Sequence, residues 1–347
     1  MKQEDIVRGF IQLGKLMTAV GEGREWSDYS LGITEEEYNN LERLVIRQKQ
    51  LNGWFTEENV RLAMNALGRQ LTATDIQNWI SHYRYSSTPR RVGIIMAGNI
   101  PLVGFHDLLC VLISGHRAVI KLSSDDNTLL PELIKHLISF VSGLEDRVTI
   151  SSGKIGELEA VIATGSDNST LYFEQYFGRY PHIFRSNRTS VAVLNGEETA
   201  KDLKLLGNDI FQYFGLGCRN VSHLLLPEGF ELHRIFEALF TFGEIIHHHK
   251  YANNYDYNRA VYLLNQVPFL DNHFVLLRES QELYSPLAVV HYHFYSSAED
   301  IANYLNQHKN KIQAVVGKGY LPFGTTQCPG LTDYADGIDT MDFLTRL

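Results

Sequence analysis

The sequence predicts an α/β protein with two doubly wound domains and a helical N-terminal segment. Short apolar runs alternate with helix-like segments from residue 91 to about residue 316. Such alternation is typical of parallel sheets that are covered by helices. The residues before this region show helical spacing throughout. A chain of 347 residues is also long enough to build two sizeable cores.

The N-terminal segment is expected to cover residues 1–88. Ile6 and Phe10 begin an apolar stripe at helical spacing. Thr34 and Glu37 form a capping box, which predicts that a helix begins there. We therefore expect several helices before the first strand.

Buried apolar runs mark the strands of both domains. In the first domain they cover residues 92–97, 118–122, 148–151, 158–163 and 190–194. In the second domain they cover residues 221–226, 274–277, 287–292 and 313–316. We expect the first α/β domain, which would bind the nicotinamide cofactor, to cover residues 89–199 and the second, which carries Cys218, to cover residues 200–323. A tail at residues 324–347 is a candidate addition to the first domain. Ligands of such sheets bind at the carboxyl ends of strands.

Composition excludes several classes of protein. The formal net charge is -9 and the basic residues are dispersed, which argues against a nucleic-acid-binding surface. No apolar run approaches the roughly 20 residues of a membrane helix, so no membrane span is expected. The acidic start does not resemble a signal peptide. Three widely spaced cysteines predict reduced thiols and a cytoplasmic location.

Cys218 is the candidate nucleophile. It follows Gly215-Leu216-Gly217, and glycines leave room for a substrate beside a thiol. Nearby backbone N–H groups or a cation would lower its pKa. Most free cysteines are small buried hydrophobic residues, so Cys218 alone fits a core position equally well. Cys110 lies among apolar residues of a predicted helix and is expected in the core, whereas Cys328 lies in a loop.

Polar residues follow the first two strands of the first domain. The Asn99 amide can donate to a developing oxyanion, or Asn99 can be an ordinary turn residue before Pro101. Lys121 ends a strand where a ribose or phosphate can bind. Ser123 and Ser124, together with the aspartate that follows, can cap the next helix.

Two further segments are candidates for cofactor binding. Thr164, Gly165 and Ser166 end a strand and start a helix, which makes a workable phosphate turn. Glu282 is either a ribose-binding carboxylate or a solvated one. There is no G-x-G-x-x-G fingerprint after a strand.

Histidines invite a metal hypothesis that the spacing disfavours. His247, His248 and His249 are adjacent, and adjacent helical residues point in directions about 100° apart. The sequence has no H-E-x-x-H and no paired C-x-x-C motif, so we expect no metal site. His223 is expected to be structural.

Taken in order, these segments resemble the aldehyde dehydrogenase superfamily and, within it, acyl-CoA reductases of the LuxC type. The resemblance runs from about residue 90 to the C-terminus. It implies that Asn99 helps form the oxyanion hole, that Cys218 is the catalytic thiol and that Glu282 holds the nicotinamide ribose. It also implies cofactor binding by the segment that ends at Lys121 and Ser124, and by the turn at residues 164–166.

The chain departs from the superfamily pattern at two places. Aldehyde-oxidising members carry a glutamate that activates water, whereas the corresponding residues 183–190 contain no carboxylate. Without that base, hydrolysis of a thioester should be slow. The departure favours exchange of the acyl group with coenzyme A. Ser124 stands where many NAD-preferring relatives carry glutamate, which favours NADPH, with NADH as the alternative.

These features predict a cytoplasmic acyl-CoA reductase that converts a fatty acyl-CoA into an aldehyde through a Cys218 thioester, with NADPH as reductant. Superfamily members are commonly oligomers, which makes a homo-oligomer a further expectation. An acyl-phosphate reductase of the glutamyl-phosphate type remains an alternative. So do a cofactor-free cysteine acyltransferase or thioesterase and a non-catalytic interaction protein.

Overall fold

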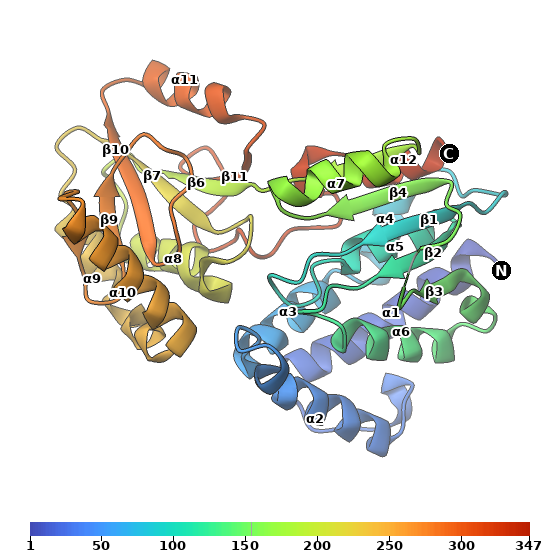
Figure 1. The fold of residues 1–347 in the computed structure, drawn as a ribbon. Helices are drawn as coiled ribbons and strands as arrows, with labels where there is room; N and C mark the ends of the chain where they lie inside the picture. The colour runs from blue at the N-terminus through green and yellow to red at the C-terminus, as the bar shows by residue number, and fades with distance from the viewer. Residues whose placement is uncertain (154) are drawn as a thin grey trace. The chain divides into compact units, whose positions relative to one another are not determined.

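The computed structural model describes residues 1–153 and 155–347. Its contacts divide the chain into two compact units. The first unit comprises Met1–Asn187 and Gly330–Leu347, and the second comprises Arg188–Pro329. Each unit is built on its own sheet with helices on its faces (Figure 1). The predicted α/β class with two doubly wound units is therefore confirmed.

The first sheet has the strand order β3-β2-β1-β4-β5, and all of its pairings are parallel. Its strands are β1 (Arg91–Ile95), β2 (Arg117–Lys121), β3 (Val148–Ile150), β4 (Ala160–Thr164) and β5 (His182–Arg185). The chain moves outward from β1 through β2 to β3 and then returns to the other side of β1. The strand order therefore reverses between β1 and β4, where ligands of open α/β sheets bind.

The helices of the first unit lie mostly on one face of this sheet. They are α1 (Gln3–Gly21), α2 (Glu35–Leu51), α3 (Glu57–Arg69), α4 (Ala73–Ile80), α5 (Phe105–Ile113), α6 (Leu129–Phe140), α7 (Asp167–Phe177) and α12 (Thr340–Thr345). Short 3-10 turns are η1 (Tyr29–Leu31), η2 (Leu144–Arg147) and η5 (Ala335–Gly337). The Thr34–Glu37 capping box opens α2 as expected.

Alternating strand residues divide the first unit into two apolar layers. Val92 and Ile120 face the large core that includes helices α1–α6 and α12. Val119 and Val161 face the opposite side, where Phe173 of α7 packs. Figure 1 shows α7 on one side of this sheet and α1 and α6 on the other.

The second sheet has the order β11-β6-β7-β10-β9-β8, and only the β8–β9 pairing is antiparallel. Its strands are β6 (Thr189–Val193), β7 (Val221–Pro227), β8 (Leu270–Asp271), β9 (Leu276–Glu279), β10 (Val289–Tyr295) and β11 (Ile312–Gly317). Its helices are α8 (Ala200–Phe211), η3 (Gln212–Gly215), α9 (His233–Leu239), η4 (Phe240–His247), α10 (His249–Leu264) and α11 (Ala298–His308).

The structure corrects three details of the sequence prediction. The boundary expected near residue 200 lies after Asn187, because β6 pairs with β7 and β11 and so belongs to the second sheet. The N-terminal helices share the core of the first sheet and do not form a separate unit. The tail from Gly330 onward joins the first unit, whereas residues 324–329 stay with the second.

A further correction concerns the start of α6. Ser123 and Ser124 were expected to cap this helix, yet it begins at Leu129 and its N-cap is Thr128. The Ser123 hydroxyl instead accepts a hydrogen bond from the Asp125 N–H at 3.2 Å, within the turn after β2. The polar cluster therefore shapes the loop at the end of the strand and not the helix.

Candidate functional site

Cys218 lies in a turn between η3 and β7 and is half-buried. The turn closes where the Asn220 N–H donates to the Gly217 carbonyl at 3.0 Å. The Ser190 hydroxyl at the start of β6 donates to the carbonyl of Cys218 itself at 3.2 Å. By contrast, Cys110 is fully buried, as expected for a core residue, and Cys328 is exposed.

Asn220 holds this turn against the preceding helix. Its Oδ1 accepts from the Gly217 N–H at 2.8 Å. Its Nδ2 lies 2.8 Å from the Gln212 carbonyl oxygen, and 3.1 and 3.2 Å from those of Asp209 and Ile210. These carbonyls end α8 and would otherwise lack partners in the helix. One buried amide thus caps α8 and fixes the backbone beside Cys218.

The backbone that leads to Cys218 is strained. Tyr213 and Phe214 have φ values of 52° and 59°, in the left-handed region. Such conformations cost on the order of 1 kcal/mol for a residue with a side chain. Gly215 continues the run with φ 80°, where a glycine carries no penalty. Non-glycine strain of this kind concentrates at functional sites, because surrounding contacts must enforce it.

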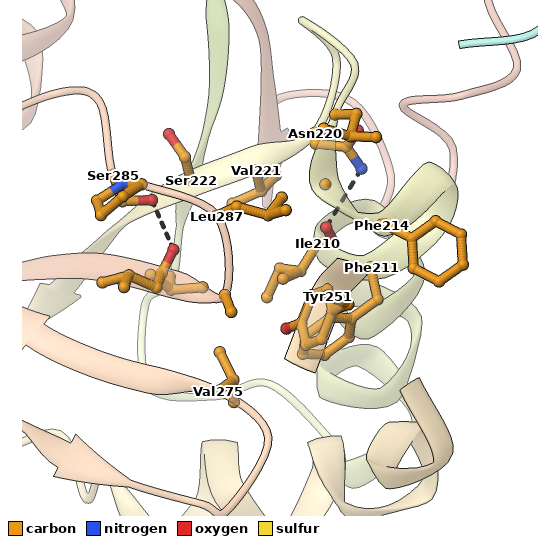
Figure 2. A pocket seen from close by; sticks show the side chains of 16 residues that line it. Ile210, Phe211, Phe214, Asn220, Val221, Ser222, Tyr251, Val275, Ser285 and Leu287 are labelled. Atoms are coloured by element: carbon orange, nitrogen blue, oxygen red, sulfur yellow. Dashed lines mark hydrogen bonds between the residues drawn. The ribbon is translucent and has the colours of Figure 1, made fainter. Parts of the chain in front are cut away.

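An apolar pocket of about 240 Å³ lies beside this turn within the second unit. Leu216 and Asn220 form one part of its wall, and residues 285–290 form another. Figure 2 shows Phe211, Val275 and Tyr251 around the same space. All of its lining residues are uncharged. The pocket therefore suits an apolar group.

Glu282 lies on irregular backbone between β9 and β10, and its side chain is 71% exposed. The Glu282 carboxylate lies 3.8 Å from the Arg278 guanidinium. The Glu282 carbonyl lies 2.9 Å from the Nδ1 atom of His223. The segment that carries Glu282 therefore contacts β7 (Val221–Pro227), the strand that follows the Cys218 turn.

The cofactor candidates of the first unit lie at the carboxyl ends of neighbouring strands. Lys121 ends β2, and its Nζ donates to the Gly153 carbonyl at 3.3 Å. Thr164 ends β4, and Gly165 follows it. Ser166 is the N-cap of α7, where its hydroxyl accepts from the Ser169 N–H at 3.3 Å. The order of the residues along the chain thus places them on one edge of the sheet.

The loop that contains Asn99 follows β1 on this edge. A Cβ atom on Gly98 would lie 2.6 Å from the Ser123 hydroxyl oxygen, so the loops after β1 and β2 approach closely. Leu102 has φ 60°, and its N–H donates to the Asp126 carboxylate at 2.8 Å. Burial raises the pKa of Asp126 to about 6. Asp126 therefore shapes the Asn99 loop, a role that no pattern in the sequence indicates.

These features fit a dinucleotide. The β1 and β4 loops flank the point where the strand order reverses, and α7 directs its N-terminus toward that edge. Lys121, Ser123 and Ser124 follow the adjacent strand. Among the described residues, no group of three or more histidine, cysteine, aspartate or glutamate side chains could hold a metal ion. In the described part of the chain, no helix is long and apolar enough to cross a membrane.

Comparisons with known proteins connect this architecture to one fold. No protein-family model and no curated protein sequence matches the chain. Solved structures do match. An NAD-dependent aldehyde dehydrogenase from Sinorhizobium meliloti aligns with a TM-score of 0.64 at 11% identity, over 92% of this chain and 71% of its own.

Two further aldehyde dehydrogenases agree. The KauB enzyme of Pseudomonas aeruginosa aligns with a TM-score of 0.63 at 12% identity, over 92% of this chain and 72% of its own. A Mycobacterium tuberculosis enzyme complexed with NAD+ gives a TM-score of 0.58 at 14% identity, over 86% of this chain and 71% of its own. The chain therefore has the aldehyde dehydrogenase fold.

Proposed function

We propose that this protein is a nicotinamide-dependent oxidoreductase that acts on acyl groups through a thioester on Cys218. More specifically, we propose that it reduces an acyl-CoA to an aldehyde with NADPH. The observation that carries the proposal is the turn around Cys218. A half-buried thiol lies on backbone that Asn220 and Ser190 fix by hydrogen bonds. A rigidly held thiol is what nucleophilic attack at a defined carbonyl needs.

In the proposed reaction the Cys218 thiolate attacks the carbonyl carbon of an acyl-CoA. The Cys218 backbone N–H would stabilise the resulting oxyanion, and the resemblance to aldehyde dehydrogenases assigns the same role to the Asn99 amide. Removing one donor of this kind typically costs about 100- to 1000-fold in rate. Coenzyme A leaves with a proton, and the acyl group stays on the sulfur. A bound NADPH would supply the hydride for the acyl carbon. Cys218 would then leave that carbon and take a proton from solvent, which would release the aldehyde and restore the thiol.

Residues 183–190 support reduction over hydrolysis. They contain no carboxylate that could activate water against the thioester. Arg185 in this stretch is buried and forms an ion pair with Asp107. Its second Nη group donates to the Thr340 hydroxyl at 2.8 Å. Arg185 is thus committed to the interior of the first unit.

The proposed cofactor contacts are those that the resemblance to aldehyde dehydrogenases implies for each unit. Lys121, Ser123 and Ser124 would meet the adenosine ribose, and the turn at residues 164–166 would meet the pyrophosphate. Glu282 would hold the nicotinamide ribose. Ser124 is exposed, short and neutral, so it would not repel a 2'-phosphate. We therefore propose a preference for NADPH over NADH.

The pocket lined by Leu216 and Asn220, which flank the Cys218 turn, favours an apolar acyl group. An acyl-phosphate reductase acting on a charged substrate would need cations near the acyl group, whereas the residues that line this pocket are uncharged. A cofactor-free acyltransferase or thioesterase remains the alternative from another class. It would consume acyl-CoA at the same rate whether or not NADPH is present.

A panel of acyl-CoAs tests the proposal. Mixing the protein with NADPH and acyl-CoAs of graded chain length should give acyl-CoA-dependent loss of NADPH absorbance. Cys218→Ala should abolish this reaction while leaving NADPH binding intact, and Cys328→Ala is the matched control. An unchanged rate in Cys218→Ala would contradict the proposal. Release of free acid without NADPH consumption would indicate a thioesterase.

A further inference from the structure

Three successive carbonyl groups around Glu282 are held by side chains from other elements. The Tyr304 hydroxyl donates to the Gln281 carbonyl at 3.3 Å. The Ser222 hydroxyl donates to the Leu283 carbonyl at 3.2 Å. Residues 281 and 282 belong to neither a strand nor a helix, so their backbone has no regular ladder. Carbonyls outside a ladder need other donors, and here side chains supply them.

The middle carbonyl, that of Glu282, has two histidine partners. The Nδ1 atoms of His223 and His291 each lie 2.9 Å from this oxygen. The two residues pair in register across β7 and β10, and both are buried. A carbonyl oxygen only accepts, so each Nδ1 must carry a hydrogen. Two neighbouring strands thus direct one N–H each at one backbone atom.

The remaining contacts fix the protonation of the cluster. The Nε2 atom of His223 lies 2.7 Å from the Nδ1 atom of His293. Since a neutral His223 has its proton on Nδ1, its Nε2 accepts from the His293 N–H. Burial lowers the pKa of His223 to about 3, and burial also lowers the pKa of His291 and His293. The donors toward Glu282 are therefore neutral imidazoles near pH 7.

We infer that His223 and His291 are positioning residues that hold Glu282 where its carboxylate can bind the nicotinamide ribose of the cofactor. This inference rests on the proposed function. The exposed Glu282 side chain has little packing of its own, so the fixed backbone carbonyl must set its location. Losing that anchor would let residues 280–286 move and would weaken only the contact with the nicotinamide half of the cofactor.

Ligand binding tests the inference without turnover. The dissociation constants of NADPH and of 2',5'-ADP, which lacks the nicotinamide ribose, are measured by calorimetry. His291→Leu should raise the dissociation constant of NADPH about tenfold, as expected for one lost hydrogen bond and added mobility. The same substitution should change the dissociation constant of 2',5'-ADP by less than about twofold. His291→Asn keeps a donor near the Nδ1 position and should restore NADPH affinity.

A double-mutant cycle ties the effect to Glu282. Glu282→Ala should raise the dissociation constant of NADPH by about tenfold. Adding His291→Leu to Glu282→Ala should then cause no further loss, because both changes remove the same contact. Hydrogen exchange of residues 280–286 in the protein without cofactor should be faster in His291→Leu and normal in His291→Asn. This measurement reports directly whether His291 holds the segment in place.

Two results with His291→Leu would overturn the inference. One is an equal loss of affinity for NADPH and 2',5'-ADP in His291→Leu, which would indicate general damage. The other is full additivity of His291→Leu and Glu282→Ala. Unmodified protein that binds no NADPH would contradict the proposed function itself. Unmodified protein that binds NADPH, with Glu282→Ala unchanged, would contradict this inference alone.

Discussion

The two units position their candidate residues by different means. In the first unit, Lys121 and Thr164 end strands, and Ser166 caps a helix, so the regular backbone sets their places. In the second unit, Cys218 and Glu282 lie on irregular backbone that side chains hold. Single substitutions outside the candidate residues should therefore disturb the second unit's site more than the first unit's.

The largest effect is expected at Asn220. Asn220→Ala leaves the Gly217 N–H and the last carbonyls of α8 without their partner. Loss of several buried hydrogen bonds should lower the free energy of unfolding by about 2–4 kcal/mol. Acylation of Cys218 should also slow. Chemical denaturation and stopped-flow acylation measure the two effects.

Asn254→Ala is the matched control for this change. Among the described residues, the Asn254 amide donates to the Lys250 carbonyl alone, one turn earlier in α10. Its removal should cost less than about 0.5 kcal/mol. Equal losses in the two variants would show that Asn220 has no special part in holding the turn.

In the first unit, the Asp126 side chain holds irregular backbone, as side chains do in the second unit. It accepts a hydrogen bond from the Leu102 N–H in the loop after β1. Its raised pKa means that the folded state keeps the proton up to about pH 6, whereas the unfolded state releases it near 3.8. Stability should therefore fall as the pH rises from about 4 to about 6, by up to about 3 kcal/mol. Asp126→Asn should remove that fall while keeping the acceptor for Leu102. Melting temperatures across this pH range check the prediction, and identical profiles would contradict it.

Filling the apolar pocket should change chain-length preference. Leu287 lines the pocket and is half-buried. Leu287→Trp should raise KM for the longest accepted acyl-CoA about tenfold and spare the shortest, since only the longer chain needs the space. Leu264→Trp, on a side chain that is 83% exposed, is the control. Uniform changes at all lengths would show that the acyl chain lies elsewhere.

The smallest effect is expected at the helix cap of the first unit. Ser166→Ala removes the acceptor for the Ser169 N–H and should lower stability by about 1 kcal/mol. Cys218 acylation should stay unchanged, because the cap acts only on α7. Ser297→Ala, which removes the matching cap of α11, should cost a similar amount in denaturation experiments. Slower acylation in Ser166→Ala would weaken the contrast between the units.

The sequence predicted the strands with continuous apolar runs and missed the less regular ones. β5 begins at His182 and ends at buried Arg185, so its composition is not that of a buried strand. β8 is only two residues long, and its pattern carries no information. The boundary error arose because β6 looks like any buried strand, and only pairing assigns it to a sheet.

The sequence proposes residue types for the site and carries no signal of the side chains that support them. Cys218 and Glu282 belong to motifs that a sequence displays. Asn220 acts through carbonyls eight to eleven residues earlier in the chain, which no local pattern reveals. His223 and His291 are 68 positions apart (291 − 223) and meet only because β7 and β10 pair in register. The spacing of two residues between His291 and His293 does indicate that these two side chains lie on the same face of β10.

The central claim is that Cys218 carries the acyl group. Incubating the protein with octanoyl-CoA in the absence of cofactor, followed by peptide mass spectrometry, tests it most directly. We expect one octanoyl group on Cys218, none on Cys110, and loss of the adduct with release of octanal when NADPH is added. NADPH oxidation without any adduct on Cys218, or an adduct that NADPH does not clear, would contradict it.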